Sequence, residues 1–411
     1  MNIDCFKCSV CGQCYNPEEV TYVCPHDGGN LDVLLDYNHL VNTVNPQDIF
    51  HSQRASIWRY LPLLPVSEPG FDATPLHKVG WTPVYRPEIL ANALNLESLW
   101  IKDESPNPSA SFKDRASALV LTRARQEGVQ TVVVASTGNA GAATAAMAAA
   151  IGMPAVILAP KSAPPAKIAQ LLVFGARVFL VDGNYDQAFE LSIAASQEFG
   201  WYNRNTGYNP FTAEGKKTAA FEIWEQVLRK LDPHAILNIF IPVGDGNIIS
   251  GIHKGFKDLQ SLGWIEQLPR LIGIQATGSA AIANAWQQNS DTIIPVEANT
   301  LADSISVNLP RDGWRALRAV RETDGCYLTV TDQEILKAIA SLGKAGIFAE
   351  PAGATAYAGL VKALADQIVE HGSPILVLNT GSGLKDIKAC MQAVPTAPII
   401  EPSITSLRKV I

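Results

Sequence analysis

The chain of 411 residues has little cysteine beyond its first 24 positions and no excess of positive charge. Five of its seven cysteines lie within residues 5–24, which excludes a disulfide scaffold for the body of the chain. Lysine and arginine total 32 against 39 aspartates and glutamates, a net charge of −7, which argues against nonspecific binding to nucleic acid or anionic membranes. We therefore expect no nucleic-acid partner, no membrane partner and a reducing, cytoplasmic location.

A long uncharged stretch, residues 128–160, is the one segment that needs a membrane test, because its length suffices to cross a bilayer. Ser136, Thr137, Asn139 and Pro154 interrupt it. A buried strand, a polar loop, a buried helix and a second strand explain this pattern better than a transmembrane helix.

The body of the chain is rich in apolar residues, at 47% hydrophobic against 17% charged, as in a folded globular protein. Short apolar runs read as buried strands at 131–135, 154–159, 177–181, 236–244, 271–276 and 375–381. Helical stretches separate them at 140–151, 186–199, 214–231 and 332–342. This alternation predicts an α/β fold with parallel sheets covered on both faces. Ligands of such folds bind at the carboxyl ends of the strands.

Three of the predicted strands end in glycine-rich polar loops. These loops are Ser136-Thr137-Gly138-Asn139, Gly244-Asp245-Gly246-Asn247 before a helix beginning near Ile248, and Thr380-Gly381-Ser382-Gly383. Glycine lets backbone N–H groups approach a ligand, and a helix N-terminus favours an anion. The second loop is therefore a candidate phosphate cradle, although ordinary strand-to-helix turns remain the alternative for any single loop.

A lysine stands in a fourth segment, Ser111-Phe112-Lys113-Asp114-Arg115, which follows a turn-rich stretch and opens a helix. Taken alone, the segment fits a solvated helix start. Its functional interpretation is an amine nucleophile that forms a Schiff base with a carbonyl cofactor.

Together these segments resemble fold-type II pyridoxal-phosphate enzymes, the tryptophan synthase β-like group, and within it the threonine synthase family. The segments that carry the resemblance are RYLPLLPV (59–66), TPVYRP (82–87), NPSASFKDR (107–115), EGKKTAAFEI (214–223), LADSISVNLPR (301–311), GIFAEPAGATAYAG (346–359) and TGSGLKD (380–386). The resemblance implies two doubly wound parallel-sheet domains with the active site between them, and a small cysteine-rich ribbon. The expected division is 1–36 for the ribbon, 37–106 with 226–411 for the large domain, and 107–225 for the small domain.

The resemblance also implies roles for individual residues, beginning with Lys113 as the catalytic lysine that carries pyridoxal 5'-phosphate. The implied cofactor contacts are Asn139 at the phenolic oxygen, Gly244, Asp245, Gly246, Asn247 and Ile248 at the phosphate, Thr380 at the pyridine nitrogen, and Phe112 beside Lys113. The implied substrate contacts are Ser136, Thr137, Gly138 and Asn205.

The implied reaction is the conversion of O-phospho-L-homoserine and water to L-threonine and phosphate, and the implied assembly is a homodimer. Thr212 and Ala140 depart from the family pattern, since an arginine and a hydroxyl residue there bind the substrate phosphate, and Ser382 replaces a common histidine. Lys216, Arg204 and Lys161 are candidates to replace the missing arginine. The departures keep open an alternative: β-elimination or β-replacement on O-phosphoserine, serine, threonine or a diamino acid.

The ribbon resembles a zinc ribbon in which one cysteine is missing. Cys8, Cys11 and Cys24 match three metal ligands of the family pattern, and Asp27 stands in the place of the fourth. The candidates for the fourth ligand are Cys5, Cys14, His26 and Asp27, and a metal-free remnant is the alternative.

Two other classes of function fit parts of the sequence. A nicotinamide enzyme can use glycine-rich loops, but the chain lacks a clear GxGxxG followed by an acid about 20 residues on, and Lys113 is then unexplained. A non-catalytic metal-ribbon scaffold that binds a protein or nucleic acid is the other. A colourless protein that borohydride cannot modify at Lys113 would favour either class.

Overall fold

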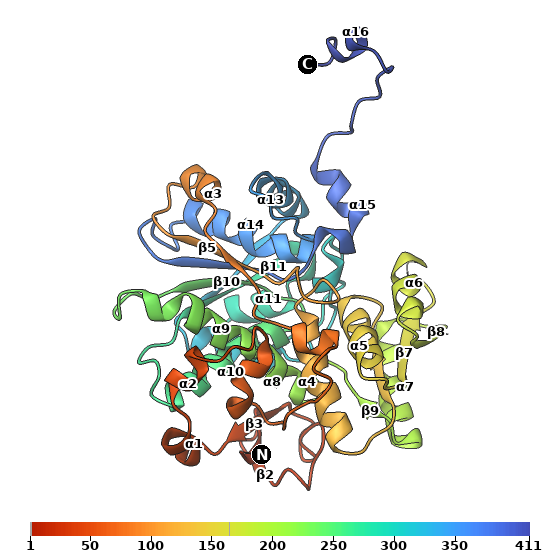
Figure 1. Ribbon diagram of the computed structural model, residues 1–411, viewed down its shortest axis with the longest axis vertical. Helices are drawn as coiled ribbons and strands as arrows, with labels where there is room; N and C mark the ends of the chain where they lie inside the picture. The colour runs from red at the N-terminus through yellow and green to blue at the C-terminus, as the bar shows by residue number, and fades with distance from the viewer. Residues whose placement is uncertain (1, 164) are drawn as a thin grey trace.

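The computed structural model describes residues 2–163 and 165–411. Within them the strands form three sheets, which lie in different parts of the molecule (Figure 1). The six-stranded sheet has the order β12-β11-β10-β13-β5-β4. Its strands are β12 (Cys326–Val330), β11 (Arg270–Ala276), β10 (Asn238–Pro242), β13 (Ile375–Asn379), β5 (Leu99–Asp103) and β4 (Val84–Tyr85). All neighbours are parallel except β4 and β5.

The four-stranded sheet is parallel throughout, in the order β8-β7-β6-β9. Its strands are β8 (Arg177–Val181), β7 (Ala155–Pro160), β6 (Val132–Ala135) and β9 (Tyr202–Asn203). The three-stranded sheet is the N-terminal ribbon, with β1 (Ile3–Cys8) between β2 (Cys14–Tyr15) and β3 (Leu31–Leu35), antiparallel to both. The two parallel sheets confirm the predicted α/β fold.

Helices cover both faces of the parallel sheets (Figure 1). Their bounds are α1 (Tyr37–Thr43), α2 (Pro46–Phe50), α3 (Glu88–Ala93), α4 (Lys113–Gln126), α5 (Asn139–Ala150), α6 (Pro165–Val173), α7 (Tyr185–Phe199), α8 (Phe211–Lys216), α9 (Thr218–Gln226), α10 (Asn247–Ser261), α11 (Ala281–Gln287), α12 (Gly313–Arg321), α13 (Asp332–Lys344), α14 (Pro351–Ala365), α15 (Ile387–Cys390) and α16 (Ile404–Leu407). Among the residues that the structure describes, none of the helices combines the length and hydropathy that crossing a bilayer requires.

Packing in the hydrophobic cores explains why the two central strands, β10 and β13, have continuous apolar sequences. Every residue of β10 and β13 is buried, because helices pack on each face of their sheet. One face packs against α9, α10 and α12, and the other against α13 and α14. The alanine-rich α5 is buried beside α4 in the core of the four-stranded sheet, where small side chains allow close approach.

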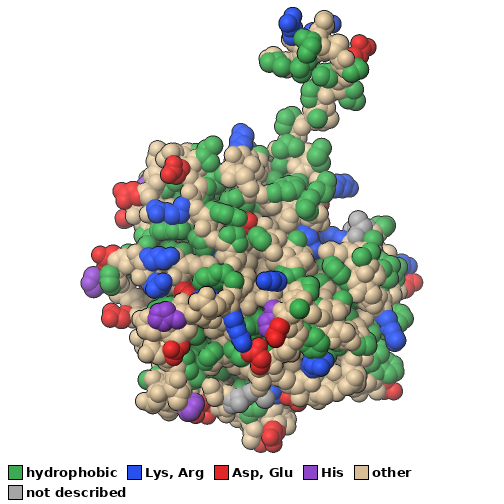
Figure 2. All heavy atoms as spheres, viewed as in Figure 1, with side chains coloured by type: hydrophobic (Ala, Val, Ile, Leu, Met, Phe, Trp, Pro, Cys, Tyr) green, Lys and Arg blue, Asp and Glu red, His purple; other side chains and the backbone are tan. Residues whose placement is uncertain are grey.

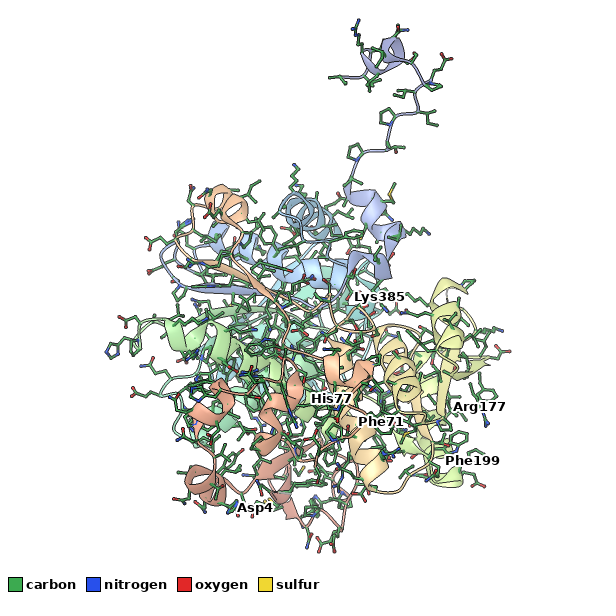
Figure 3. All side chains as sticks on the ribbon, in the orientation of Figure 1. Asp4, Phe71, His77, Arg177, Phe199 and Lys385 are labelled. Carbon is green, nitrogen blue, oxygen red and sulfur yellow. The ribbon has the colours of Figure 1, made fainter. Side chains whose placement is uncertain are left out.

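The two parallel sheets meet near the start of α4. There Lys385 donates from Nζ to the Ser109 carbonyl (3.2 Å) and to Gln170 Oε1 (2.9 Å), and Figure 3 shows it where the two parts of the body join. On the face drawn in Figure 2, basic and acidic side chains are interspersed without a continuous basic patch. The C-terminal α16 lies away from the body at the end of an extended segment (Figure 1).

Two details differ from the sequence-based expectation. The predicted helix 214–231 is divided into α8 and α9 at Lys217. Two 3-10 turns that were not predicted lie at Ile57–Leu63 and Pro75–Lys78, and Pro75 stands at the start of the second, where proline is tolerated. The strands of the six-stranded sheet come from residues 84–103 and 238–379, and those of the four-stranded sheet from residues 132–203. Phe221 of α9 packs in the core of the six-stranded sheet.

Candidate active site

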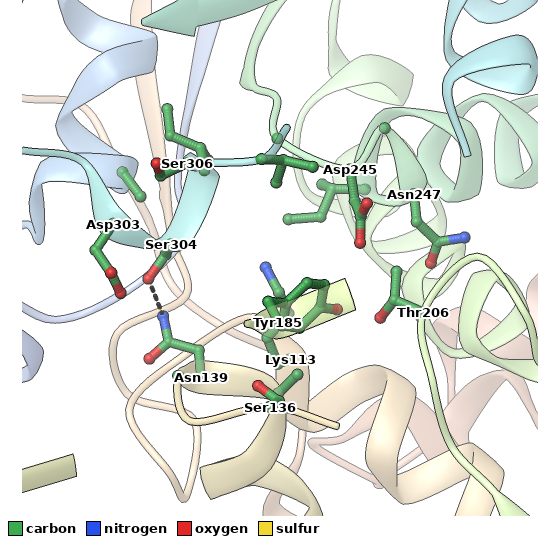
Figure 4. Close-up of a pocket in the computed structure, with 18 of the residues that line it drawn as sticks. Lys113, Ser136, Asn139, Tyr185, Thr206, Asp245, Asn247, Asp303, Ser304 and Ser306 are labelled. Atoms are coloured by element: carbon green, nitrogen blue, oxygen red, sulfur yellow. Dashed lines mark hydrogen bonds between the residues drawn. The ribbon is translucent and has the colours of Figure 1, made fainter. Parts of the chain in front are cut away.

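A cavity of about 370 Å³ lies between the two parallel sheets, at the carboxyl ends of their strands. It is lined by Lys113, by the loops that follow β6 and β10, and by Thr380 after β13 (Figure 4). The predicted residues that line it are Lys113, Ser136, Thr137, Gly138, Asn139, Gly244, Asp245, Gly246, Asn247, Ile248 and Thr380. Four segments distant in sequence are thus brought to one site.

Lys113 is the first residue of α4 and extends into this cavity (Figure 4). The Phe112 N–H donates to the Thr380 carbonyl (2.9 Å), so the helix start is tied to the loop after β13. Burial lowers the pKa of the Lys113 amine, and Arg204 lowers it further, while Glu350 and Asp245 act in the opposite direction. A lowered pKa favours the neutral amine, which is the form of lysine that attacks a carbonyl group.

The loop Gly244–Asn247 has the shape of an anion cradle. Gly246 has φ of +91°, and a Cβ there would lie 2.6 Å from the Asp312 carbonyl oxygen. A Cβ on Gly244 would lie 2.8 Å from Ile305 Cα. No side chain caps the N-terminus of α10, a helix of 15 residues, so its first N–H groups are available to a phosphate.

Asp245 is the unusual member of this cradle, because an ionised carboxylate there would repel a phosphate. Its Oδ1 accepts a hydrogen bond from the Arg311 N–H (2.9 Å). Burial raises the pKa of the Asp245 carboxyl, and Asp312 raises it too, against the lowering effects of the Arg311 bond and charge and of Lys216. The Asp245 carboxyl therefore holds its proton to a higher pH in the folded protein than an exposed aspartate does.

We predict that Asp245→Asn tightens pyridoxal-phosphate binding by about tenfold at alkaline pH. The amide removes the repulsion between the Asp245 carboxylate and the cofactor phosphate, and a repulsion worth roughly one pKa unit corresponds to that factor. Because the folded-state pKa is raised, the wild-type carboxyl is neutral below it and becomes repulsive as pH rises through it. Equilibrium dialysis of cofactor at mildly acidic and alkaline pH measures this. Equal pH dependence in the two proteins would contradict the assignment.

Asn139, the first residue of α5, is held by an acid that the sequence reasoning did not select. Its Nδ2 donates to Glu350 Oε1 (2.9 Å) and Oε2 (3.0 Å), and also to Ser304 Oγ (3.3 Å; Figure 4). Glu350 is buried, and burial raises the pKa of its carboxyl. In the sequence, Glu350 could have been noticed because it stands directly before Pro351, the first residue of α14.

Two predicted site residues lie outside the cavity lining. Asn205 is buried, with its Oδ1 accepting from the Ala135 N–H (2.9 Å) and its Nδ2 donating to Ser192 Oγ (2.6 Å). Its amide is thus committed to holding the end of β6, and not available to a substrate. Phe112 is fully buried in the core, and its N–H donates to the Thr380 carbonyl.

Several lining residues were missed from the sequence. They are Tyr185, Thr206, Asp303, Ser304 and Ser306 (labelled in Figure 4). Of the three basic residues considered from the sequence, Arg204 and Lys216 also line the cavity, whereas Lys161 is not among its lining residues. Asp303, Ser304 and Ser306 lie in the segment LADSISVNLPR, which shows no periodicity that would assign a role to single residues. Tyr185 opens α7 after β8, a strand whose end was not among the glycine-rich loops.

The lining fits a phosphate-bearing aldehyde cofactor, because it pairs the Lys113 amine, whose pKa is lowered, with a glycine cradle that side chains would fill. A model of the family described as pyridoxal-phosphate dependent enzyme matches residues 76–381. The processed threonine deaminase isoform 2 of Solanum lycopersicum superposes with a TM-score of 0.66 at 22% identity, covering 80% of this chain and 92% of that one. Maize serine racemase gives 0.65 at 24% identity, covering 79% and 94%. The fold and the site thus define a fold-type II pyridoxal-phosphate-dependent enzyme.

Sequence relatives narrow the class. The threonine synthase of Methanocaldococcus jannaschii is 36% identical over 408 residues, which are 98% of this chain and 98% of the relative. That of Methanosarcina acetivorans is 35% identical over the same shares. The chain therefore belongs to the threonine synthase family of pyridoxal-phosphate-dependent enzymes.

A second cluster lies in the ribbon, where the ligand atoms of Cys8, Cys11, Cys24 and Asp27 all lie within 4.8 Å of one another. Cys11 Sγ and Cys24 Sγ are 3.8 Å apart, and Cys8 Sγ lies 3.4 Å from Asp27 Oδ1. A tetrahedral zinc ion with standard bond lengths separates two sulfurs by about 3.8 Å, and a sulfur from a carboxylate oxygen by about 3.5 Å. The donor set therefore fits zinc.

Of the candidates for the fourth ligand, the geometry favours Asp27. Cys5, Cys14 and His26 are not part of the four-residue cluster. The Cys8 sulfur also accepts from the N–H groups of Val10 (3.4 Å) and Cys11 (3.5 Å), as metal-bound thiolates do through their supporting hydrogen bonds.

Proposed function

We propose that the protein converts O-phospho-L-homoserine and water to L-threonine and phosphate with pyridoxal 5'-phosphate bound at Lys113. The observation that carries this proposal is the shared cavity. It places the readily neutral Lys113 amine with the Gly244–Asn247 cradle and the Ser136–Asn139 loop, in a chain of the threonine synthase family. The cofactor would be held by the cradle, by Asn139 and by the Thr380 hydroxyl.

When bound, pyridoxal phosphate supplies an electron-withdrawing ring that stabilises negative charge next to the substrate nitrogen. The neutral Lys113 amine accepts the proton from the substrate Cα and takes part in proton loss at Cβ. A hydroxyl at Thr380, unlike a carboxylate, does not force the ring nitrogen to be protonated. These residues fix geometry and proton traffic, while phosphate leaves from Cγ and water adds at Cβ.

The Ser136–Asn139 loop is suited to hold the substrate carboxylate. It precedes α5, a helix of 12 residues whose N-cap Gly138 has no side chain to occupy the first N–H groups. Those groups and the hydroxyls of Ser136 and Thr137 are anion-binding donors. Holding the carboxylate there fixes the amino acid next to Lys113 in the shared cavity.

The alternative substrates are tested by a panel. The loaded enzyme is given O-phospho-L-homoserine, O-phosphoserine, serine and threonine, and the rates of phosphate, pyruvate and 2-oxobutyrate formation are compared. We expect phosphate from O-phospho-L-homoserine to form fastest. A faster release of pyruvate or 2-oxobutyrate would transfer the assignment to β-elimination on another amino acid.

We further propose that the ribbon binds one structural zinc ion through Cys8, Cys11, Cys24 and Asp27, because their spacing matches a tetrahedral site. The ribbon packs on the body, where the Trp314 Nε1–H donates to the Ser9 carbonyl (2.7 Å). Zinc would therefore stabilise the ribbon and its contact with α12.

For this site we predict about one zinc per chain in the purified protein, loss of zinc in Cys11→Ala, and weakened retention in Asp27→Ala. Cys14→Ala is the matched control, since Cys14 is exposed and outside the cluster, and it should keep the metal. Metal analysis with and without a chelator provides the measurement. Zinc that depends on Cys14 and not on Asp27 would refute this ligand set.

The cytoplasmic location and the homodimer are also proposed. A reducing compartment is supported by the described cysteines, none of which forms a disulfide. Light scattering of the purified enzyme measures the assembly, and a monomeric mass would contradict the homodimer.

A further inference from the structure

Among the described residues, the buried lysines and arginines are paired with acids, with two exceptions. Ion pairs at 3.0 Å or less join Arg59 to Glu225, Lys102 to Glu222, Arg115 to Glu104, Lys217 to Glu214, Lys254 to Glu214 and Arg315 to Asp32. Arg204 and Lys216 are also buried, yet neither pairs with a carboxylate among the described residues. Both line the cavity that contains Lys113. An unpaired buried cation is costly unless an anion joins it, so the cavity is built to receive anionic groups.

Arg204 lies just beyond β9, and its guanidinium contacts only neutral groups. Nε donates to Ser117 Oγ (3.1 Å) and Nη1 to Thr206 Oγ1 (2.9 Å). Its buried Nη2 has no hydrogen-bond partner in the described part of the chain. Burial lowers the pKa of the guanidinium to about 10, which still leaves it charged at neutral pH. The charged guanidinium of Arg204 therefore has an unused N–H donor, at Nη2, in the wall of the cavity.

Lys216 is placed differently, because it contacts the Gly244–Asn247 cradle. Its Nζ donates to Asn247 Oδ1 (2.5 Å), and Asn247 is the first residue of α10. Lys216 is therefore positioned to neutralise the phosphate of the cofactor. Arg204 contacts Ser117 and Thr206, which lie outside that loop. Arg204 is therefore available to bind a second anion besides the cofactor phosphate.

The side chain of Thr212 does not line the cavity. Its side chain is fully buried, and its hydroxyl donates to the Asn209 carbonyl (2.8 Å). It is absent from the lining, whereas Arg204 and Thr206 are both part of it. An arginine at 212 would have to displace packed neighbours before it reached the cavity.

We propose that Arg204, with Thr206 beside it, binds the phosphate of the substrate and selects phosphorylated amino acids. This assignment rests on the proposed function and names the residue that receives its leaving group. As the bond between Cγ and the phosphate ester oxygen breaks, the electron pair stays on that oxygen, and the guanidinium stabilises the phosphate dianion. Water supplies the hydroxyl of the product, so that one water is consumed for each phosphate released.

The test is titration of the cofactor-loaded enzyme with inorganic phosphate by calorimetry, in the wild type, Arg204→Met and Arg204→Lys. We expect Arg204→Met to weaken phosphate binding by about 10- to 100-fold, the range for a charge-assisted hydrogen bond to an anion. Arg204→Lys should restore part of it, since the charge is kept without the planar fork. In turnover, the KM for O-phospho-L-homoserine should rise in the same order.

Two controls separate this role from others. Lys161→Met removes a positive charge from an exposed lysine paired with Asp182 and should leave phosphate affinity unchanged. Cofactor content should stay at the wild-type level in Arg204→Met and fall in Lys216→Met. Cofactor loss in both Arg204 variants would assign Arg204 to the cofactor phosphate and overturn the proposal, as would unchanged phosphate affinity. If Arg204→Met does not fold, the same two readouts decide from Arg204→Lys.

The two proposals fail separately. Phosphate binding that depends on Arg204 in an enzyme that makes no threonine would overturn the proposed reaction and leave the anion site. Threonine formation by an Arg204→Met enzyme with unchanged phosphate affinity would overturn the anion site and leave the reaction.

Discussion

Lys113→Ala is expected to lower turnover by about 1,000-fold or more, since the variant loses both the covalent attachment of the cofactor and the base at the substrate Cα. The fold should survive. No carboxylate pairs with Lys113 among the described residues, and alanine is a good helix former at the first position of α4. The measurements are turnover, borohydride trapping of the cofactor followed by peptide mapping, and thermal unfolding.

The matched control is Lys161→Ala, because Lys161 is an exposed lysine of the same part of the chain. It should retain turnover and trapping at Lys113. Full activity in Lys113→Ala, or a trapped cofactor on another lysine, would contradict the proposed mechanism.

Glu222→Gln is expected to destabilise the fold by about 3–5 kcal/mol, the cost of breaking a buried ion pair from one side. Glu222 is fully buried, with its carboxylate 2.6 Å from both Lys102 Nζ and Arg115 Nη1. It also accepts from the N–H groups of Trp81 (2.7 Å) and Thr82 (3.1 Å). The amide leaves Lys102 without a carboxylate, and denaturant unfolding measures the loss.

The same carboxylate predicts a pH dependence of stability. Its pKa is lowered from 4.5 to about 2, because Arg115 and Lys102 outweigh the effect of burial. A lowered folded-state pKa stabilises the fold above the unfolded value, and this contribution is lost as pH falls from 4.5 towards 2. The difference in the free energy of unfolding between wild type and Glu222→Gln should therefore shrink over that range.

Asp366→Asn is the matched control for Glu222→Gln. It removes the acid of an exposed pair with Lys362 and should cost less than about 1 kcal/mol. Equal losses in the two variants would show that the buried cluster does not carry the stability assigned to it.

Apolar strands and glycine-rich loops were predictable from sequence because each is a local pattern. Continuous apolar runs such as 375–381 require burial on both faces, and the carboxyl ends of parallel strands meet at one edge. Lys113, Asn139 and the Gly244–Asn247 loop could therefore be placed in one site before the fold was known.

Residues whose role depends on a distant partner could not be predicted. Glu350 becomes part of the site only because α14 brings it to Asn139, which is 211 positions away in the chain. Arg204 was a candidate from the sequence, but the lack of a carboxylate partner for it among the described residues is a property that no local pattern records. The hydrogen-bond partners of Asn205 could not be predicted for the same reason, since Ala135 and Ser192 lie in other elements.

The central claim is tested most directly by incubating the cofactor-loaded enzyme with O-phospho-L-homoserine and quantifying phosphate and L-threonine in the same sample, with Lys113→Ala as the blank. The account predicts that phosphate and threonine form in equal amounts, and that neither forms above background in the blank. Phosphate without threonine, or no phosphate from a protein that still carries the cofactor on Lys113, would contradict it.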